Sequence, residues 1–322
     1  MATADQIKSL IRSHQSDDPE RFYSIALQVA AHEAKQGHTS LAHDIREIVN
    51  KSRKSRGAVV LQFPKEMHGL VLSEHPDISR NALVMPKSMD ERIHRIIHEF
   101  RQQNKLKSHG LTNRRKVLLI GPPGTGKTMT AKVLAHELKL TLHTIQVDRL
   151  VTKFMGETAA KLRQIFELIQ NEQGVYLFDE FDAIGGERSM ENDVGEMRRV
   201  LNSFLQFIEQ DTSDSVLVAA TNNPKLLDKA LFRRFDDVMY YASPDADERT
   251  RLIQNVLGTY LSDHTLTDET ITASEDLSHA EIDLACRDAI KNAILSDQNT
   301  VSSSELLRTL KDRVDAHAGL RE

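Results

Sequence analysis

The chain has 322 residues, of which 39% are hydrophobic and 28% are charged, a composition typical of a soluble globular protein with room for two or three compact units. Its formal net charge of −5 provides no overall positive field, which argues against nucleic acid as a partner. The single cysteine, Cys286, excludes an internal disulfide framework and a cysteine metal cluster. The sequence shows no signal-peptide pattern and no apolar stretch long enough to span a membrane, so we expect a cytoplasmic protein with no membrane partner.

Residues 1–57 are expected to form a bundle of three short amphipathic helices, because apolar side chains recur there at helical spacing. The histidines of this region have no metal-binding spacing and are interpreted as surface or packing residues; they are His14, His32, His38 and His43. Residues 51–56 carry four positive charges, which suits either a docking strip for an acidic partner or nucleic acid, or a solvated linker. The run is short and lacks aromatic residues, so we favour a linker, and residues 58–88, with three prolines, are expected to continue it.

Residues 89–242 alternate between amphipathic helices and apolar strands, the pattern of an α/β domain in which helices cover both faces of a parallel sheet. The expected strands are 117–120, 141–147, 175–178, 216–220 and 237–241, and the expected helices are 89–107, 129–138, 159–169 and 195–208. Residues 243–322 are expected to be entirely helical, with helices at 245–261 and 280–295 and a last helix that begins at a capping box formed by Ser302 and Glu305.

Residues 121–128, Gly-Pro-Pro-Gly-Thr-Gly-Lys-Thr, fit the phosphate-binding pattern G-x-x-x-x-G-K-[ST] and lie between an apolar strand and a helix, the order that this loop requires. Glycines let the backbone curl so that its N–H groups point inward, and the helix N-terminus adds partial positive charge. We expect Lys127 to reach the β- and γ-phosphates and the Thr128 hydroxyl to ligate Mg²⁺. A chance glycine-rich turn is the alternative, which the flanking strand and helix disfavour. The residues expected to bind the nucleotide are Pro122, Pro123, Gly124, Thr125, Gly126, Lys127, Thr128, Met129 and Asp179.

Two carboxylates, Asp179 and Glu180, follow the apolar strand 175–178. The carboxyl ends of parallel strands meet at one edge of a sheet, so we expect this pair beside the phosphate loop. Asp179 is then placed to hold Mg²⁺ together with Thr128, and Glu180 is free to polarise the attacking water. A purely structural Asp-Glu turn is the alternative, and its position downstream of a phosphate loop disfavours it.

Asn222 follows the next apolar strand, and its uncharged amide can orient a water beside the γ-phosphate without adding repulsion. The segment lacks the Asn-Lys-x-Asp pattern of guanine recognition, so ATP is favoured over GTP as the substrate.

The segment 227–236, Leu-Asp-Lys-Ala-Leu-Phe-Arg-Arg-Phe-Asp, completes a series of motifs that resembles the AAA-family ATPases over roughly residues 85–320. The resemblance implies a P-loop NTPase fold with a C-terminal helical lid, and a homo-oligomeric ring, usually a hexamer, with a nucleotide at each subunit boundary. It also implies that Asn222 is a sensor of the nucleotide and that Arg233 and Arg234 enter the neighbouring subunit's site to stabilise transition-state charge. Family members often separate these arginines by two residues, so which one reaches the phosphate is open here. An ion pair with Asp236 or Asp237 is the alternative role.

Residues Phe154, Met155 and Gly156 are similar to the family's pore loop, which grips an extended polypeptide; ordinary loop packing is the alternative. A second pore loop is expected at 185–188. Residues 277–282 are similar to the family's Ser-Gly-Ala-Asp element, which contacts the adenine side, with His279 in place of the glycine. A surface histidine at a helix start is the alternative for His279.

Together these features predict an α/β P-loop NTPase with a helical N-terminal domain (1–57), a linker (58–88), an α/β nucleotide-binding domain (89–242) and a helical lid (243–322). The expected function is Mg²⁺-dependent ATP hydrolysis that remodels or unfolds a protein substrate, with a nucleotide-switched assembly or loading factor as the alternative. A P-loop kinase is disfavoured, because Glu180, Asn222 and the arginine pair suit water as the acceptor. The chain has no H-E-x-x-H or G-x-S-x-G pattern, so any protease that receives unfolded substrate would be a separate polypeptide.

Overall fold

The computed structural model describes residues 69–150, 155–181, 193–223 and 232–318, together with residues 29, 30, 38, 43 and 47. The chain divides into two compact units, Met1–Glu66 and Met67–Glu322. The expected helical bundle of residues 1–57 and the basic stretch 51–56 lie almost wholly outside the described residues. Among the helices that are described, none is long and apolar enough to cross a membrane.

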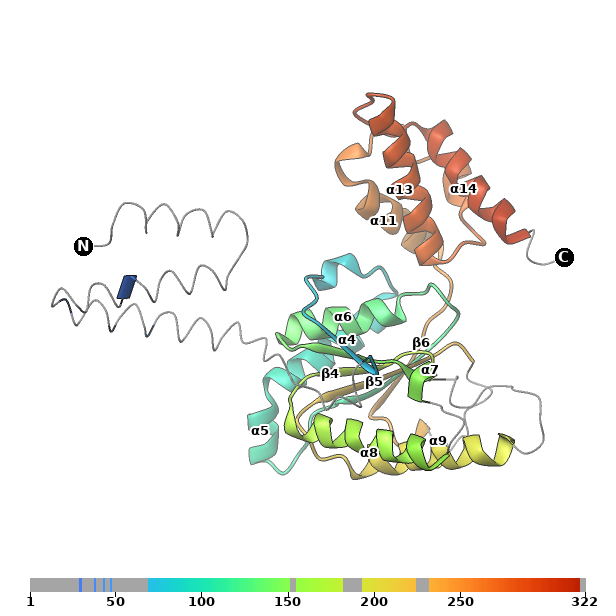
Figure 1. Cartoon of the computed structure of the whole chain (residues 1–322). Coiled ribbons are helices and arrows are strands. Elements are labelled where there is room, and N and C mark those ends of the chain that lie inside the picture. The colour runs from blue at the N-terminus through green and yellow to red at the C-terminus, as the bar shows by residue number, and fades with distance from the viewer. Residues whose placement is uncertain are drawn as a thin grey trace. The chain divides into compact units, whose positions relative to one another are not determined.

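Six strands of the described part of the chain form one sheet in the order β1-β3-β4-β5-β2-β6 (Figure 1). Their bounds are β1 (Val71–Glu74), β2 (Lys116–Ile120), β3 (Leu142–Ile145), β4 (Val175–Phe178), β5 (Val216–Thr221) and β6 (Asp237–Tyr240). The last five strands are parallel, and β1 pairs antiparallel with β3 at the edge. Every residue of β4 and β5 is buried, as expected for parallel strands that are covered on both faces.

Helices cover both faces of this sheet (Figure 1). Helices α4 (Lys87–Arg101) and α6 (Lys127–Leu138) share one hydrophobic core with the sheet, and α8 (Met155–Asn171) packs beside α9 (Asp193–Gln210) on the opposite face. On that second face, Phe204 of α9 meets Phe178 of β4 edge-on with ring centroids 4.9 Å apart. Two short helices, α5 (Gln103–Ser108) and α7 (Val147–Leu150), complete this layer structure. The predicted fold class, a largely parallel sheet sandwiched by helices, is confirmed.

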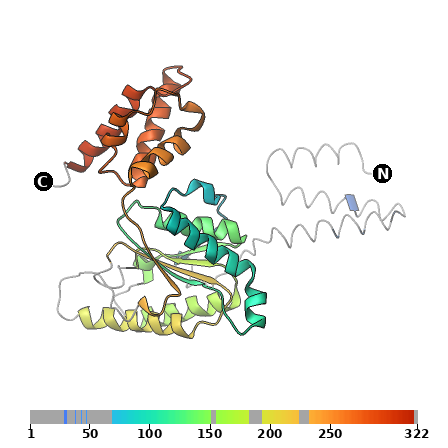
Figure 2. The same ribbon diagram turned by 180° about the vertical axis from the view of Figure 1, so that it is seen from behind.

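The chain after residue 245 forms a helical lid with a hydrophobic core of its own (orange to red in Figure 2). Its elements are α11 (Ala246–Leu257), the 3₁₀ helix η5 (Gly258–Tyr260), α12 (Asp268–Ala273), α13 (His279–Leu295) and α14 (Ser303–Ala318). Helices α11, α12 and α13 each begin at a capping box, in which two otherwise unpaired N–H groups are satisfied reciprocally. The cap predicted for the last helix is present as well, since Glu305 N donates to Ser302 Oγ over 3.2 Å.

The sequence predictions and the structure differ at several local points. Segment 58–88, expected to be a linker, contains β1 and the 3₁₀ helix η2 (Arg80–Ala82). The helix expected at 89–107 is interrupted at Gln102, which divides it into α4 and α5. The helix expected at 245–261 ends at Leu257, because Gly258 adopts φ 52° and ψ −117°, a conformation outside the helical region. Helix α12 was not predicted.

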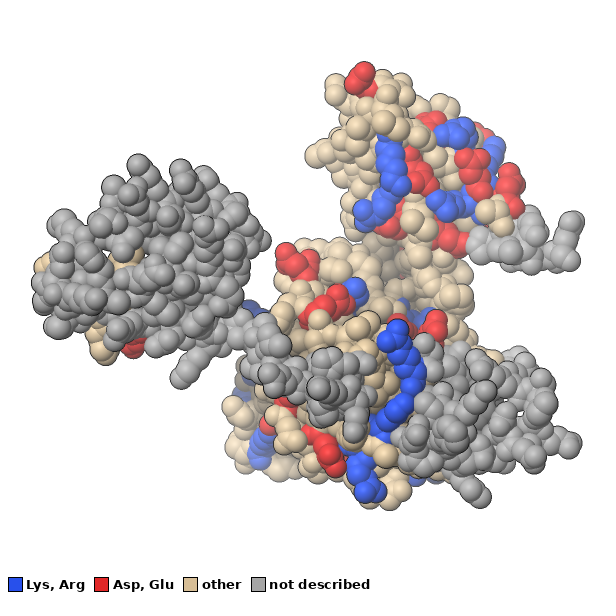
Figure 3. Space-filling model, in the orientation of Figure 1, with Lys and Arg blue, Asp and Glu red and all other residues tan. Residues whose placement is uncertain are grey.

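Charged side chains of both signs intermingle over the lid surface that faces the viewer in Figure 3. Arg308 pairs with Glu305 at 2.7 Å and with Asp312 at 3.3 Å, and Asp288 pairs with Arg313. Exposed pairs of this kind contribute little to stability, but adjacent opposite charges cancel each other's field. This face of the described lid therefore presents no one-signed patch of the sort that nucleic acid requires.

Candidate active site

The loop between β2 and α6 is wrapped around its own lysine. Lys127 Nζ donates hydrogen bonds to the carbonyl oxygens of Gly121 (2.8 Å) and Pro122 (2.7 Å), and its side chain is buried. Gly124 (φ 74°) and Gly126 (φ 97°) lie in the left-handed region, where a side chain would be strained. This curled backbone at the start of α6 is the arrangement in which N–H groups and the helix dipole together attract phosphate.

The base of the loop is fixed by Tyr241, which follows β6. Its hydroxyl lies 2.7 Å from Thr130 Oγ1 of α6, and burial raises the pKa of Tyr241 to about 12, so the phenol stays protonated. Any Cβ at Gly121 would lie 2.4 Å from the Tyr241 carbonyl oxygen. Only glycine therefore allows the loop to leave β2 at this point.

The carboxylates expected after β4 lie beside the loop. Thr128 Oγ1 donates to Asp179 Oδ2 over 2.7 Å, so the two residues predicted to share a metal ion are in direct contact. Both present oxygen atoms, which Mg²⁺ prefers as ligands. The adjacent Glu180 has φ 51°, rare for a non-glycine residue, and its N–H donates to Asp179 Oδ1 over 3.0 Å. Backbone strain of this kind is concentrated at functional sites.

Asn222 completes this edge of the sheet. Because β5 lies between β2 and β4, its carboxyl end falls between the phosphate loop and Asp179. The next residue, Asn223, donates its N–H to Thr221 Oγ1 over 3.0 Å, which fixes the turn that follows β5. Three segments far apart in the sequence are therefore brought to one place, as predicted from the ends of the strands.

A cavity of about 650 Å³ joins these groups, a volume suited to a small-molecule ligand. Of the residues predicted for the site, its wall includes Pro123, Gly124, Thr125, Gly126, Lys127, Thr128, Met129, Asp179, Glu180 and Asn222. Pro122 instead supplies the carbonyl that holds Lys127. The rest of the wall was not predicted, apart from His279 and Ala280 of the lid element expected at 277–282; it is Ala82, Leu83, Val84, Met85, Leu252, Asn255, Val256, His279, Ala280, Asp283 and Arg287.

The lid is joined to the phosphate loop by a backbone hydrogen bond. Ala280 N, at the start of α13, donates to the carbonyl oxygen of Gly124 over 3.0 Å. Ser278 lies so close that a Cβ at Gly124 would be 2.6 Å from its Oγ. A second contact joins the lid to the segment before α4: Arg251 of α11 donates a hydrogen bond to the carbonyl oxygen of Met85 over 3.1 Å. Lid and loop thus form one continuous wall of the cavity.

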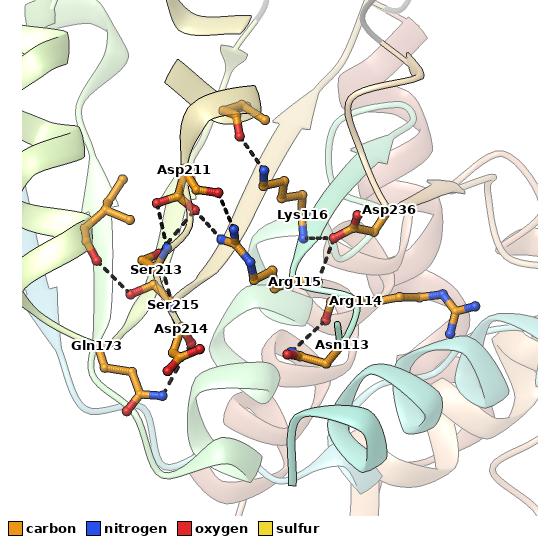
Figure 4. A network of polar contacts seen from close by, with 12 residues as sticks. Asn113, Arg114, Arg115, Lys116, Gln173, Asp211, Ser213, Asp214, Ser215 and Asp236 are labelled. Atoms are coloured by element: carbon orange, nitrogen blue, oxygen red, sulfur yellow. Dashed lines mark hydrogen bonds and ion pairs between the residues drawn. The ribbon is translucent and has the colours of Figure 1, made fainter. Parts of the chain in front are cut away.

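Arg233 and Arg234 are not part of this cavity wall. Arg234 Nε pairs with Glu209 Oε2 of α9 at 3.1 Å, whereas Arg233 is exposed. The aspartates that could have paired with these arginines have other partners. Asp236 Oδ2 accepts the backbone N–H groups at the start of β2, from residues 115 and 116, over 2.9 Å each (Figure 4), and Asp237 pairs with Arg92.

The expected pore-loop residue Phe154 and the second loop at 185–188 lie outside the described residues. Met155 and Gly156 begin helix α8.

Comparison with known proteins gives a consistent result. The family model of the ATPase family associated with various cellular activities (AAA) matches residues 117–243. A Sinorhizobium fredii protein described as an uncharacterized AAA family ATPase, y4kL, is 33% identical over 329 residues, which covers 99% of this chain and 98% of that protein. The proteasome-activating nucleotidase of Methanopyrus kandleri is 32% identical over 80% of this chain, and the peroxisomal ATPase pex6 of Schizosaccharomyces pombe is 30% identical over 80% of this chain. The matches cover 62% and 27% of the lengths of those two proteins. The chain belongs to the AAA family of ATPases.

Proposed function

We propose that this ATPase hydrolyses Mg²⁺-ATP with the groups gathered around the cavity and uses the energy to remodel a protein substrate in an oligomeric ring, a hexamer by analogy with its family. The observation that carries the proposal is the contact between Thr128 and Asp179 in the same cavity as Lys127, Glu180 and Asn222. A phosphate loop alone would bind a nucleotide. The added carboxylate and amide are what hydrolysis requires.

The triphosphate lies against the loop in this proposal. Lys127 leaves the carbonyls that hold it and pairs with the β- and γ-phosphates, while the loop N–H groups and the α6 dipole bind the remaining charge. Thr128 and Asp179 hold Mg²⁺, which neutralises negative charge on the phosphates when bound.

The attacking water lies between Glu180 and Asn222. Glu180 accepts a proton from the water as it attacks, and Asn222 orients the water with an uncharged amide, which avoids repulsion from the γ-phosphate. We assign Glu180 this role rather than Asp179, because Asp179 is already engaged with the Thr128 hydroxyl.

Of the two adjacent arginines, we assign Arg233 to the neighbouring subunit's nucleotide. Arg234 is held within its own chain by Glu209, whereas Arg233 is exposed and available to a second copy. Asp236 anchors the segment that carries both arginines to the start of β2, through the backbone N–H groups of residues 115 and 116. An arginine that stabilises transition-state charge in trans contributes about 10³- to 10⁵-fold to turnover.

A mixing experiment tests the shared site. Lys127→Ala protein retains Arg233, and Arg233→Ala protein retains a complete phosphate loop, so mixed rings should recover part of the hydrolysis that each variant has lost. Arg234→Ala is the matched control and should retain most activity alone, since an exposed ion pair contributes at most about 1 kcal/mol. Absence of rescue at every ratio, in rings shown to contain both variants, would contradict catalysis in trans.

Two observations support protein remodelling as the use of this energy. One relative is a proteasome-activating nucleotidase by name, and the sequence around Phe154 is similar to a pore loop. The name of that relative also supports a separate protease as one recipient of the unfolded substrate. Phe154→Ala should then retain ATPase activity and assembly but lose work on the protein substrate. A nucleotide-switched loading factor would instead tolerate this change, and loss of ATPase activity and assembly together would show that Phe154 only packs.

A further inference from the structure

The cavity wall formed by the lid and by the segment before α4 is lined by apolar side chains and by His279. Leu83 and Val84 come from the segment before α4, and Leu252 and Val256 from the lid helix α11. Apolar walls with a few polar groups suit the flat faces and polar edge of a nucleotide base. With the triphosphate on the loop, this apolar wall is the part of the cavity left for the base.

His279 has two ring nitrogens that are buried and without a hydrogen-bond partner. Leaving such atoms unpaired is unfavourable, and a ligand that supplies a hydrogen bond recovers the loss. The two charged residues that α13 contributes to this wall already have partners, because Arg287 Nε pairs with Asp283 Oδ2 at 2.7 Å. Among the described residues of this wall, His279 is thus the one with buried polar atoms whose bonding capacity is unused.

The position of His279 is set by its neighbours in the chain. Ser278 caps α13, and Ala280 donates its N–H to Gly124 of the phosphate loop. The residue between them therefore has a fixed place beside the loop, on the wall of the cavity.

The chemical form of the imidazole follows from its surroundings. Burial lowers the pKa of His279, so the ring is neutral at pH 7, and the backbone of Val84 acts in the opposite direction. A neutral imidazole has one N–H donor and one acceptor nitrogen, so the ring has an acceptor available to a ligand.

We propose that His279 recognises the base of the nucleotide: after a small rotation of the ring, its acceptor nitrogen receives a hydrogen bond from the 6-amino group of adenine. A 6-oxopurine would place an acceptor against an acceptor and leave both unpaired. The inference rests on the proposed placement of the triphosphate on the loop. It assigns to the lid a part in choosing ATP over GTP that a glycine, which has no side chain, could not perform.

Equilibrium titration with nucleoside diphosphates tests this selectivity without hydrolysis. The probes are ADP, the diphosphate of purine riboside, which has hydrogen in place of the amino group, and IDP, which carries a 6-oxo group. The wild-type chain should bind ADP about fivefold more tightly than the purine riboside diphosphate, and prefer ADP over IDP by roughly tenfold or more. His279→Phe, which keeps the ring volume, should bring both ratios close to one. His264→Phe, a change at an exposed lid histidine outside this cavity, is the matched control and should leave both ratios unchanged.

The outcomes separate this inference from the proposed function. His279→Phe with wild-type ratios would overturn the role of His279. His279→Gln, whose amide oxygen can accept the same hydrogen bond, should restore part of the preference for ADP, and no restoration in a variant of wild-type stability would count against the bond. Lys127→Ala should weaken all three diphosphates by a similar factor. If it weakens none of them, the triphosphate placement is wrong, whatever His279 does.

Discussion

Gly124→Ala separates the lid's effect on nucleotide binding from its effect on folding. The new Cβ would lie 2.6 Å from Ser278 Oγ and 3.3 Å from Ala280 Cβ, on a residue with φ 74°. The left-handed conformation costs about 1–2 kcal/mol whether or not the lid is docked, so this part lowers the free energy of unfolding. The clash acts only when α13 approaches the loop. It should break the Ala280–Gly124 hydrogen bond, which contributes about 1 kcal/mol, and so weaken ADP binding by about fivefold or more.

Gly110→Ala is the matched control. Gly110 has φ 71°, but a Cβ there would meet nothing within 4 Å. This variant should lose about the same 1–2 kcal/mol of unfolding free energy in urea while it binds ADP like the wild type. Both variants are measured by denaturant unfolding and by ADP titration. Equal ADP affinity in Gly124→Ala, Gly110→Ala and the wild type would refute the coupling between lid and loop.

Two further predictions concern groups outside the cavity. Burial, with a smaller effect of the His75 charge, lowers the pKa of His143 to about 4. Because the unfolded chain takes up this proton at a higher pH than the folded chain, the free energy of unfolding should fall by about 3 kcal/mol between pH 6.5 and 4. Urea titrations at several pH values should show this decline in the wild type and not in His143→Asn, and the same pH dependence in both proteins would contradict the role of His143. Asp236→Ala should lower the free energy of unfolding by about 1–2 kcal/mol in the same assay, because two backbone N–H groups lose their acceptor. The control Asp214→Ala breaks an exposed ion pair with Lys107 and should lower it by less than about 1 kcal/mol. Equal losses in the two variants would contradict the anchoring role of Asp236.

The part of the site that could be predicted from the sequence is the part set by strand ends. The phosphate loop, Asp179 and Asn222 each follow an apolar strand directly, and a parallel sheet gathers such positions at one edge. The contact between Thr128 and Asp179 could therefore be predicted once the fold class was correctly inferred.

The other walls of the cavity depend on tertiary packing that no local pattern encodes. Leu83 and Val84 lie in a stretch without helical or strand periodicity, and Leu252 faces the cavity only because the lid helix docks there. Strand β1 was missed for a related reason. Val71 is its only buried residue, so the alternation that marks a half-buried strand is absent.

The choice between the adjacent arginines shows the same limit. Sequence alone could not distinguish Arg233 from Arg234, because both are long cations next to each other in the chain. Glu209, which pairs with Arg234, lies 25 residues earlier on α9, and only the fold brings them together.

Hydrolysis of ATP in this cavity with the help of Glu180 is tested most directly by measuring the ATP affinity and the turnover of Glu180→Gln in the same preparation. The variant should bind ATP within about threefold of the wild type and lose turnover by about 10²- to 10³-fold, the effect of removing one group that acts only on the transition state. Glu172→Gln, at a residue that precedes β4 and lies outside the cavity wall, is the control and should turn over ATP like the wild type. Wild-type turnover by Glu180→Gln would contradict the account.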